Sequence, residues 1–66
     1  MTIFLNGESH AVTAHLILSQ LLEQLELADK RVAVEINGEI VPRSQHEHTK
    51  LQTDDRIEII HAVGGG

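Results

Sequence analysis

The sequence contains no cysteine, no tryptophan and no tyrosine, and Phe4 is its single aromatic residue. Without cysteine the chain can form neither a disulfide nor a zinc–thiolate site, and it has no thiol nucleophile of its own. One aromatic ring provides no stacking platform for single-stranded nucleic acid. A chain of 66 residues without covalent staples is expected to fold as one small domain around a compact apolar core.

Basic residues are also scarce, because 10 Asp and Glu stand against 5 Lys and Arg and give a formal net charge of -5 at pH 7. A nucleic-acid-binding surface needs a basic stripe, so this balance argues against such a partner. No apolar run reaches the roughly 18 residues of a membrane-spanning helix, and residues 1–5 lack the basic region of a signal peptide. We therefore expect a cytoplasmic protein with no nucleic-acid and no membrane partner.

The chain opens with the pattern of a β-hairpin. Residues 2–5 are rich in strand-forming side chains. Asn6-Gly7 follows, and this pair is a strong two-residue turn signal because both residues tolerate positive φ. Residues 9–13 are then expected to form the return strand.

A helical period replaces the strand pattern over residues 18–27. Four leucines recur at spacings of three and four and make one apolar stripe: Leu18, Leu21, Leu22 and Leu25. Thr13 is a possible N-cap, although it would place the start of the helix well before the stripe. Residues 15–17 offer no good cap.

Strand patterns return in the second half of the chain. Three strands are predicted, over residues 32–36, 39–41 and 56–63. Asn37-Gly38 is a second hairpin turn, and Pro42 marks residues 39–41 as an edge strand because proline cannot donate to a ladder. Residues 43–53 are polar and are expected to be irregular, with Leu51 as their anchor to the core.

The element order β-β-α-β-β-β predicts an α+β domain with one helix packed on one face of a mixed sheet. The last strand would lie beside the first, in parallel, at the centre of the sheet, which is the β-grasp (ubiquitin-like) arrangement. We expect this domain to cover residues 1–63, with residues 64–66 as a flexible tail. The expected inward residues are Ile3, Leu5, Leu18, Leu21, Leu22, Leu25, Val32, Val34, Ile36, Leu51, Ile57 and Ile59.

The opposite face of the sheet has no cover within the chain. By strand alternation it should present the side chains of Phe4, Ala33, Glu35, Glu58 and Ile60. An apolar centre with acidic surroundings is typical of a docking patch, although scattered exposed apolar residues are also normal. We predict that Phe4, Ala33, Ile60 and Val63 form a partner-binding face.

Two further segments invite a functional interpretation. Gly64, Gly65 and Gly66 follow the last predicted strand and carry no side chains, so they could enter a narrow channel of a partner and present the carboxylate of Gly66. The alternative is a frayed terminus without function. The segment His46-Glu47-His48 resembles a metal-ligand cluster but lacks evident third and fourth ligands, so we expect a solvated loop and no metal.

Taken together, several segments spread over the whole chain resemble the ThiS family, the sulfur carriers of thiamine thiazole biosynthesis. They are Ile3-Phe4-Leu5-Asn6-Gly7, Leu21-Leu22-Glu23-Gln24-Leu25, Val32-Ala33-Val34-Glu35-Ile36-Asn37, Ile40-Val41-Pro42-Arg43, and Asp55-Arg56-Ile57-Glu58-Ile59 with Val63-Gly64-Gly65-Gly66. Two features depart from the family pattern. Asp54 stands where a glycine is common, and residues 15–17 lack the Thr or Ser that often opens the helix.

The resemblance implies a carrier that is not itself an enzyme and binds no cofactor. An E1-like (ThiF-like) adenylyltransferase would use ATP with magnesium to adenylate Gly66, with Gly65 beside the reacting carboxylate and Gly64 extending its reach. Sulfur from a cysteine desulfurase system would then give a terminal thiocarboxylate for a ThiG-like thiazole synthase. Carriers for molybdopterin synthesis or tRNA thiolation, and protein modifiers that form isopeptide bonds, remain alternatives with the same tail.

Overall fold

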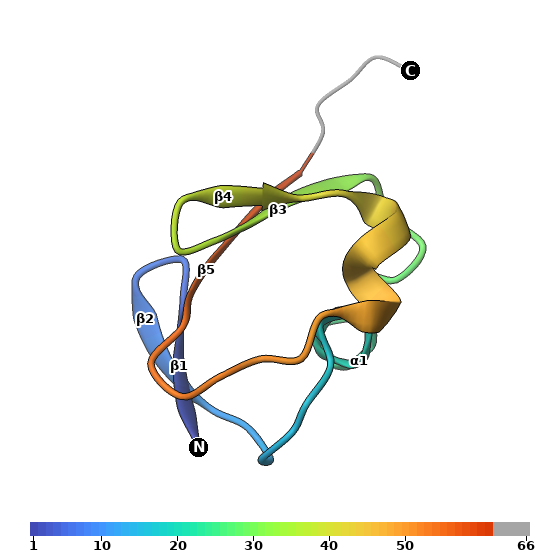
Figure 1. The fold of residues 1–66 in the computed structure, drawn as a ribbon. Coiled ribbons are helices and arrows are strands. Elements are labelled where there is room, and N and C mark those ends of the chain that lie inside the picture. The colour runs from blue at the N-terminus through green and yellow to red at the C-terminus, as the bar shows by residue number, and fades with distance from the viewer. Residues whose placement is uncertain (62–66) are drawn as a thin grey trace.

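A computed structural model describes residues 1–61. The elements are β1 (Thr2–Leu5), β2 (Glu8–Ala11), α1 (Leu18–Gln24), β3 (Val32–Ile36), β4 (Glu39–Val41), the 3₁₀ helix η1 (Arg43–His48) and β5 (Arg56–His61). The strands curve around one side of the molecule, and α1 and η1 lie on the other (Figure 1). This arrangement confirms the predicted α+β fold with a helix on one face of the sheet.

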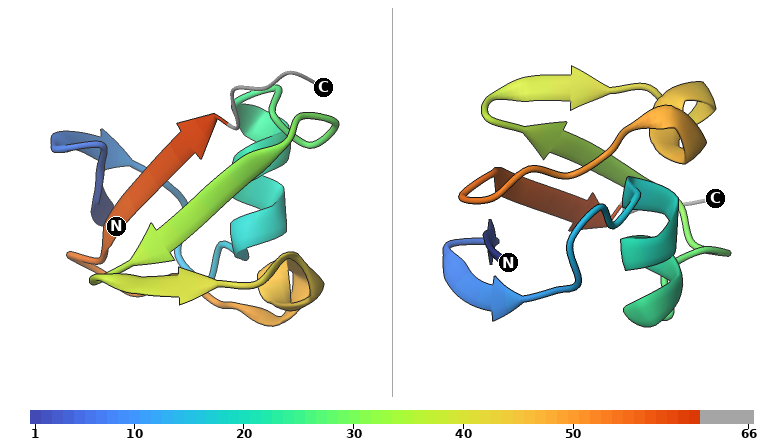
Figure 2. Two further views of the ribbon diagram at one scale, coloured as in Figure 1. Left: turned by 90° about the horizontal axis from the view of Figure 1, so that it is seen from above. Right: turned by 60° about the horizontal axis from the view of Figure 1, so that its bottom comes forward.

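The sheet has the spatial order β2-β1-β5-β3-β4, so that β5 is central and β4 is an edge strand. β5 runs parallel to β1, with Leu5 opposite Ile57, and antiparallel to β3, with Val34 opposite Ile59. Figure 2 (left) shows β3 and β5 side by side across the sheet with α1 behind them. The last strand therefore lies beside the first one, in parallel, as the β-grasp prediction requires.

Both Asn-Gly pairs form the turns that the sequence predicts. Asn6 and Gly7 have φ values of 49° and 86°, and Asn37 and Gly38 have 53° and 86°. Two successive positive φ values define the hairpin turn whose twist matches that of the strands it joins. The register follows directly from these turns, because Leu5 pairs with Glu8 and Ile36 pairs with Glu39.

The predicted bounds of one strand need correction, and those of the last strand are tested only in part. The return strand β2 covers Glu8–Ala11 rather than residues 9–13, since a two-residue turn ends at Gly7 and pairing starts at once. Beyond Ala11, the Val12 N–H still donates to the carbonyl of Met1. Met1 is the first residue of the sequence, so the pairing ends there. The last strand is described as far as His61, and the predicted extension over residues 62–63 lies outside the described residues.

The helix is shorter than the leucine stripe suggests. It ends at Gln24 rather than at Leu27, because Leu25 is the C-cap and Glu26 adopts a φ of 60°, which no right-handed helix tolerates. Its N-cap is Ile17, so Thr13, which the sequence offered as one possible cap, does not begin the helix. The Gln20 side chain accepts a hydrogen bond from the Ile17 N–H at 3.0 Å, which satisfies the helix start in place of a Ser or Thr cap. Within residues 1–61 no helix is long and apolar enough to cross a membrane.

The core lies between the sheet and α1. The buried apolar residues are Ile3, Leu16, Leu18, Leu21, Leu22, Val34, Leu51, Ile57 and Ile59. Eight of these were predicted to point inward, and Leu16 was missed because it precedes the helix and belongs to no periodic pattern. Four of the predicted residues pack against this core while partly buried, namely Leu5, Leu25, Val32 and Ile36.

The segment between β4 and β5 is more regular than expected. Residues 43–48 form η1, which begins after Pro42, whose fixed φ of -60° suits an N-cap. Two backbone hydrogen bonds of 2.8 Å, from Leu18 N–H to the Thr49 carbonyl and from Leu51 N–H to the Leu16 carbonyl, join the segment to the start of α1. These bonds place Leu51 in the core, which confirms it as the predicted anchor.

Candidate functional site

The uncovered face of the sheet presents the residues that strand alternation predicted. Ile60 is 53% exposed, Ala33 and Glu58 are exposed, and Phe4 and Glu35 are half-buried. Sequence reasoning missed Ile40, which is 63% exposed. Ile40 lies on the same face, because Val41 pairs with the buried Val34 and its neighbour in β4 must point the other way. The alternation of Glu39-Ile40-Val41 could have revealed it.

The arrangement on this face differs from the expected apolar centre with acidic surroundings. Ala33 and Ile60 pair directly across β3 and β5, near the end of β5. Glu35 and Glu58 form the next outward-facing pair along the same two strands, and Phe4 lies opposite Arg56 at the start of β5. Two carboxylates therefore separate the apolar Ala33–Ile60 pair from Phe4. The binding role of these residues stays a prediction.

Two shallow hollows adjoin the start of β5. One, of about 250 Å³, is lined by Phe4, Arg56 and Glu58 among others. The other, of about 400 Å³, lies between Asn37 and the same two charged residues of β5. Arg56 and Glu58 border both hollows, so each hollow has one basic and one acidic side chain in its lining. We assign no ligand to either hollow.

The residues predicted to react lie beyond the described part of the chain. Val63 and Gly64, Gly65 and Gly66 are outside residues 1–61. The structure does define where the chain reaches them: His61, at the end of the central strand β5, pairs with Val32 at the start of β3. The Ala33–Ile60 pair stands one residue before this point. The exposed Ala33–Ile60 pair therefore lies next to the last described residue of β5.

The asparagines of the two hairpin turns bind β5 through their side chains. The Ile59 N–H donates to Asn6 Oδ1 at 2.9 Å, and Asn6 Nδ2 lies 3.4 Å from the Ile59 carbonyl oxygen. At the other end of the strand, the Arg56 N–H donates to Asn37 Oδ1 at 3.0 Å. Sequence reasoning assigned both asparagines only to turns. These side-chain hydrogen bonds form only because of the register in which β5 pairs with its neighbouring strands. No pattern in the sequence predicts that register.

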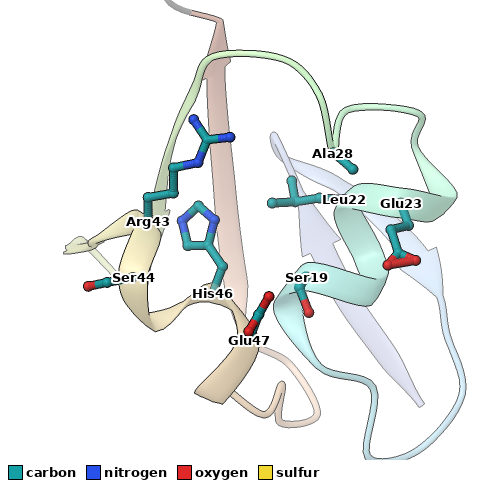
Figure 3. A pocket seen from close by; sticks show the side chains of 8 residues that line it. All are labelled: Ser19, Leu22, Glu23, Ala28, Arg43, Ser44, His46 and Glu47. Atoms are coloured by element: carbon teal, nitrogen blue, oxygen red, sulfur yellow. The ribbon is translucent and has the colours of Figure 1, made fainter.

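The histidine segment is partly buried rather than solvated. His46 is 8% exposed, and its Nε2 lies 3.2 Å from the Val41 carbonyl oxygen, whereas His48 is exposed. Figure 3 shows His46 and Arg43 of η1 facing Leu22 of α1 across a cavity of about 370 Å³. The expectation of a solvated loop was therefore wrong for His46. Among residues 1–61, no three His, Asp or Glu side chains gather as a metal site would require.

Comparison with known proteins relates the whole chain to one protein family. The model of the ThiS family matches residues 3–66. The chain is 46% identical over 66 residues to thiazole synthase of Magnetococcus marinus. This match covers the whole of the chain but only 20% of that protein. It is 33% identical over 66 residues to sulfur carrier protein ThiS of Escherichia coli, and each protein is covered completely. The chain thus spans about a fifth of the length of the thiazole synthases that it matches.

A solved structure gives the same result. The crystal structure of thiamine biosynthesis protein ThiS from Geobacter metallireducens aligns over the whole of both chains, with a TM-score of 0.86 and 32% sequence identity. The mixed five-stranded sheet, the parallel pairing of β1 with β5 and the helix α1 on one face define a ubiquitin-like β-grasp protein. Within that class, the chain belongs to the ThiS family, which confirms the resemblance of its motifs.

Proposed function

We propose that this chain is a sulfur carrier of thiamine biosynthesis and that the carboxylate of Gly66 carries the sulfur. The observation behind this proposal is that the family match runs from residue 3 through residue 66 and so includes all three terminal glycines. A relative of the same length, matched from end to end, is named a sulfur carrier protein. The chain would act as a co-substrate of partner enzymes, which perform the chemistry.

The chemistry requires activation because a carboxylate is a poor electrophile. In the proposed sequence, a Gly66 oxygen attacks the α-phosphorus of ATP, which gives an acyl-adenylate and releases pyrophosphate. The terminal sulfur of an enzyme persulfide then attacks the acyl carbon and expels AMP, which leaves an acyl disulfide. A second thiol attacks the enzyme-side sulfur of this disulfide, so that the thiocarboxylate leaves and a new disulfide holds the two oxidised sulfurs. The ThiF-like adenylyltransferase would supply magnesium and the ATP site, and a cysteine desulfurase would supply the persulfide.

The proposed acceptor of the sulfur is a ThiG-like thiazole synthase. Two relatives that carry this name, 46% and 36% identical, match the whole of this chain within a protein about five times as long. A carrier-like region inside a thiazole synthase supports the proposal that the carrier passes its sulfur directly to such an enzyme. This support favours the thiazole acceptor over those of molybdopterin synthesis and tRNA thiolation.

The described fold suits a carrier whose reacting end follows a strand that is anchored in the core. β5 is the central strand, with β1 on one side and β3 on the other. Ile57 and Ile59 anchor it in the core, with 0% and 9% of their surfaces exposed. The residues that would carry sulfur therefore come after the central strand of the sheet in the sequence. A partner could grip the exposed Ala33–Ile60 pair while it handles the residues after His61.

The central test is intact-mass spectrometry of the full chain after incubation with a ThiF-like adenylyltransferase, ATP and a persulfide-loaded desulfurase. We expect a mass gain equal to the difference between a sulfur atom and an oxygen atom, localised to Gly66 by peptide mapping. Omission of ATP is the control and should abolish the gain. No gain under conditions that load a known carrier would contradict the proposal, and stable adducts on lysines of other proteins would favour a modifier.

A genetic test separates the acceptors. A strain without this protein should require thiamine, and the thiazole moiety alone should restore its growth. A requirement that thiazole does not relieve, but that products of the molybdopterin pathway do, would redirect the proposal to the alternative carrier class.

A further inference from the structure

Asn6 stands at the point where β1 ends while β5 continues. The ladder between the two strands stops at Leu5, opposite Ile57, and Asn6 and Gly7 then turn the chain toward β2. The Asn6 N–H still donates to the Ile57 carbonyl at 2.8 Å. For the backbone of Ile59 to pair on this side, β1 would have to continue beyond Leu5. The chain instead turns toward β2 at Asn6 and Gly7.

The carboxamide of Asn6 takes the place of that residue. Its Oδ1 accepts the Ile59 N–H at 2.9 Å, and its Nδ2 lies 3.4 Å from the Ile59 carbonyl oxygen. A carboxamide carries the same donor and acceptor as a peptide group, so it can extend a sheet edge by one position. Both contacts are partly buried, which raises the cost of leaving the Ile59 groups unpaired.

The position of this contact on β5 points to a role beyond stability. Ile59 is the last residue of β5 with a buried side chain, and Ile60 and His61 after it are exposed. β3 pairs with both of these residues from one side. Among residues 1–61, the carboxamide of Asn6 is the last group of the first hairpin that bonds to β5 from the other side.

We infer that Asn6 is a positioning residue for the carrier function, because its carboxamide holds the end of β5 and thereby fixes the point from which the chain continues beyond His61. The inference rests on the proposed function, in which partner enzymes take up the residues after His61. Without the carboxamide, the backbone of β5 beyond Ile57 would be paired only with β3, and the buried Ile59 side chain would be its one remaining anchor to the core. Any extra freedom at its end must be lost again on binding, which weakens binding and leaves the chemistry of Gly66 unchanged.

The second hairpin supplies a matched control. Asn37 has the same turn conformation as Asn6, and its Oδ1 accepts the N–H of Arg56 at 3.0 Å while its Nδ2 donates to Asp55 Oδ1 at 3.0 Å. These bonds hold the start of β5, at the end of the strand away from His61. Glycine is the suitable replacement at both positions, since it accepts the positive φ and removes only the side chain.

The experiment measures the full chain as a substrate of the ThiF-like adenylyltransferase by ATP–pyrophosphate exchange. For Asn6→Gly we expect KM to rise about two- to tenfold, the range for one lost hydrogen bond, with kcat unchanged. For Asn37→Gly we expect the KM of the wild type. Asn6→Asp keeps the oxygen that accepts the Ile59 N–H, so its KM should fall between those of the wild type and Asn6→Gly.

Hydrogen exchange provides a readout that does not depend on the enzyme. The Ile59 amide should exchange faster in Asn6→Gly only, and the Arg56 amide faster in Asn37→Gly only. If Asn6→Gly does not fold, the KM of Asn6→Asp carries the test, because the Ile59 amide keeps its acceptor in that variant and should exchange at nearly the wild-type rate. An unchanged KM for the variants at position 6, or an equal rise in KM for Asn6→Gly and Asn37→Gly, would overturn the inference. A wild-type chain that the enzyme cannot activate would instead refute the proposed function, and the positioning role with it.

Discussion

Glu35 and Glu58 carry like charges at neighbouring positions on the outer face of the sheet. They form a direct pair across β3 and β5, which brings their Cβ atoms to about 5 Å from each other. Like charges in this position are destabilising. On the same strand face, Arg56 stands two residues from Glu58, so it can offset part of this repulsion at Glu58. Glu35 has Ile40 as its other cross-strand neighbour, which offers no compensation.

Replacement of Glu35 by Gln should therefore stabilise the domain. We expect the free energy of unfolding in urea to rise by about 0.5 kcal/mol at neutral pH and low salt, because the substitution removes the repulsion and keeps the shape of the side chain. High salt should shrink this gain, since screening already weakens the repulsion in the wild type. Glu47→Gln, at an exposed position of η1, is the control and should leave the free energy of unfolding unchanged. A destabilised Glu35→Gln variant would contradict this account.

At the residue scale, the sequence predicts burial better than it predicts hydrogen bonding. The alternation of Ile57, Glu58, Ile59 and Ile60 correctly separates inward from outward side chains, because the period of a strand is fixed by its backbone. The partners of Asn6 could not be predicted in this way. Its bond to Ile59 spans 53 positions of the sequence and depends on the register that two packed strands adopt.

At the scale of elements, the outer face is divided between a central and an edge region. β5 and β3 carry Ile60 and Ala33 close to His61, whereas β4 carries Ile40 at the edge of the sheet. Ile40 and Ile60 are both large, apolar and more than half exposed. They share chemistry and face, and they differ in their distance along the sheet from the end of β5. This difference allows the binding role of the central region to be tested.

Ile60→Ser should weaken binding to the ThiF-like adenylyltransferase about tenfold or more, as is typical for an apolar anchor at the centre of an interface. Ile40→Ser should change binding by less than about threefold, since rim positions contribute little. Titration calorimetry measures both variants, and urea unfolding checks that each retains the stability of the wild type. Equal losses for the two variants would show that β4 belongs to the interface, and no loss for Ile60→Ser would remove Ile60 from the predicted partner-binding face.

Strands were predicted more accurately than helices for a physical reason. The Asn-Gly turns fix where β1, β2, β3 and β4 meet, because a two-residue loop leaves no freedom in the pairing that follows it. The helix α1 has no such marker at either end. Its N-cap is Ile17, supported by the side chain of Gln20, and it ends before the leucine stripe does because the backbone at Glu26 turns left-handed. The 3₁₀ helix η1 follows Pro42 in a polar segment whose apolar residues show no period.

At the scale of the whole molecule, the proposed carrier separates the part that folds from the part that reacts. Among residues 1–61, every buried apolar residue lies between Ile3 and Ile59. The match to the ThiS family extends further, through residue 66. The proposed function thus places the chemistry on residues that contribute none of the described core, so stability and sulfur loading should respond to different changes in the chain.

Two variants of opposite character test this separation. A chain that stops at Gly65 should unfold in urea with a free energy within about 0.5 kcal/mol of the wild type, because it loses nothing from the core, yet it should gain no sulfur in the intact-mass assay. Ile57→Ala keeps all three terminal glycines and removes a side chain that is 0% exposed, so its free energy of unfolding should fall by about 2–5 kcal/mol. Its folded fraction should still load sulfur. Loss of cooperative unfolding in the shortened chain would show that the terminal residues belong to the folded body, and sulfur loading of that chain would show that Gly66 is not the carrier.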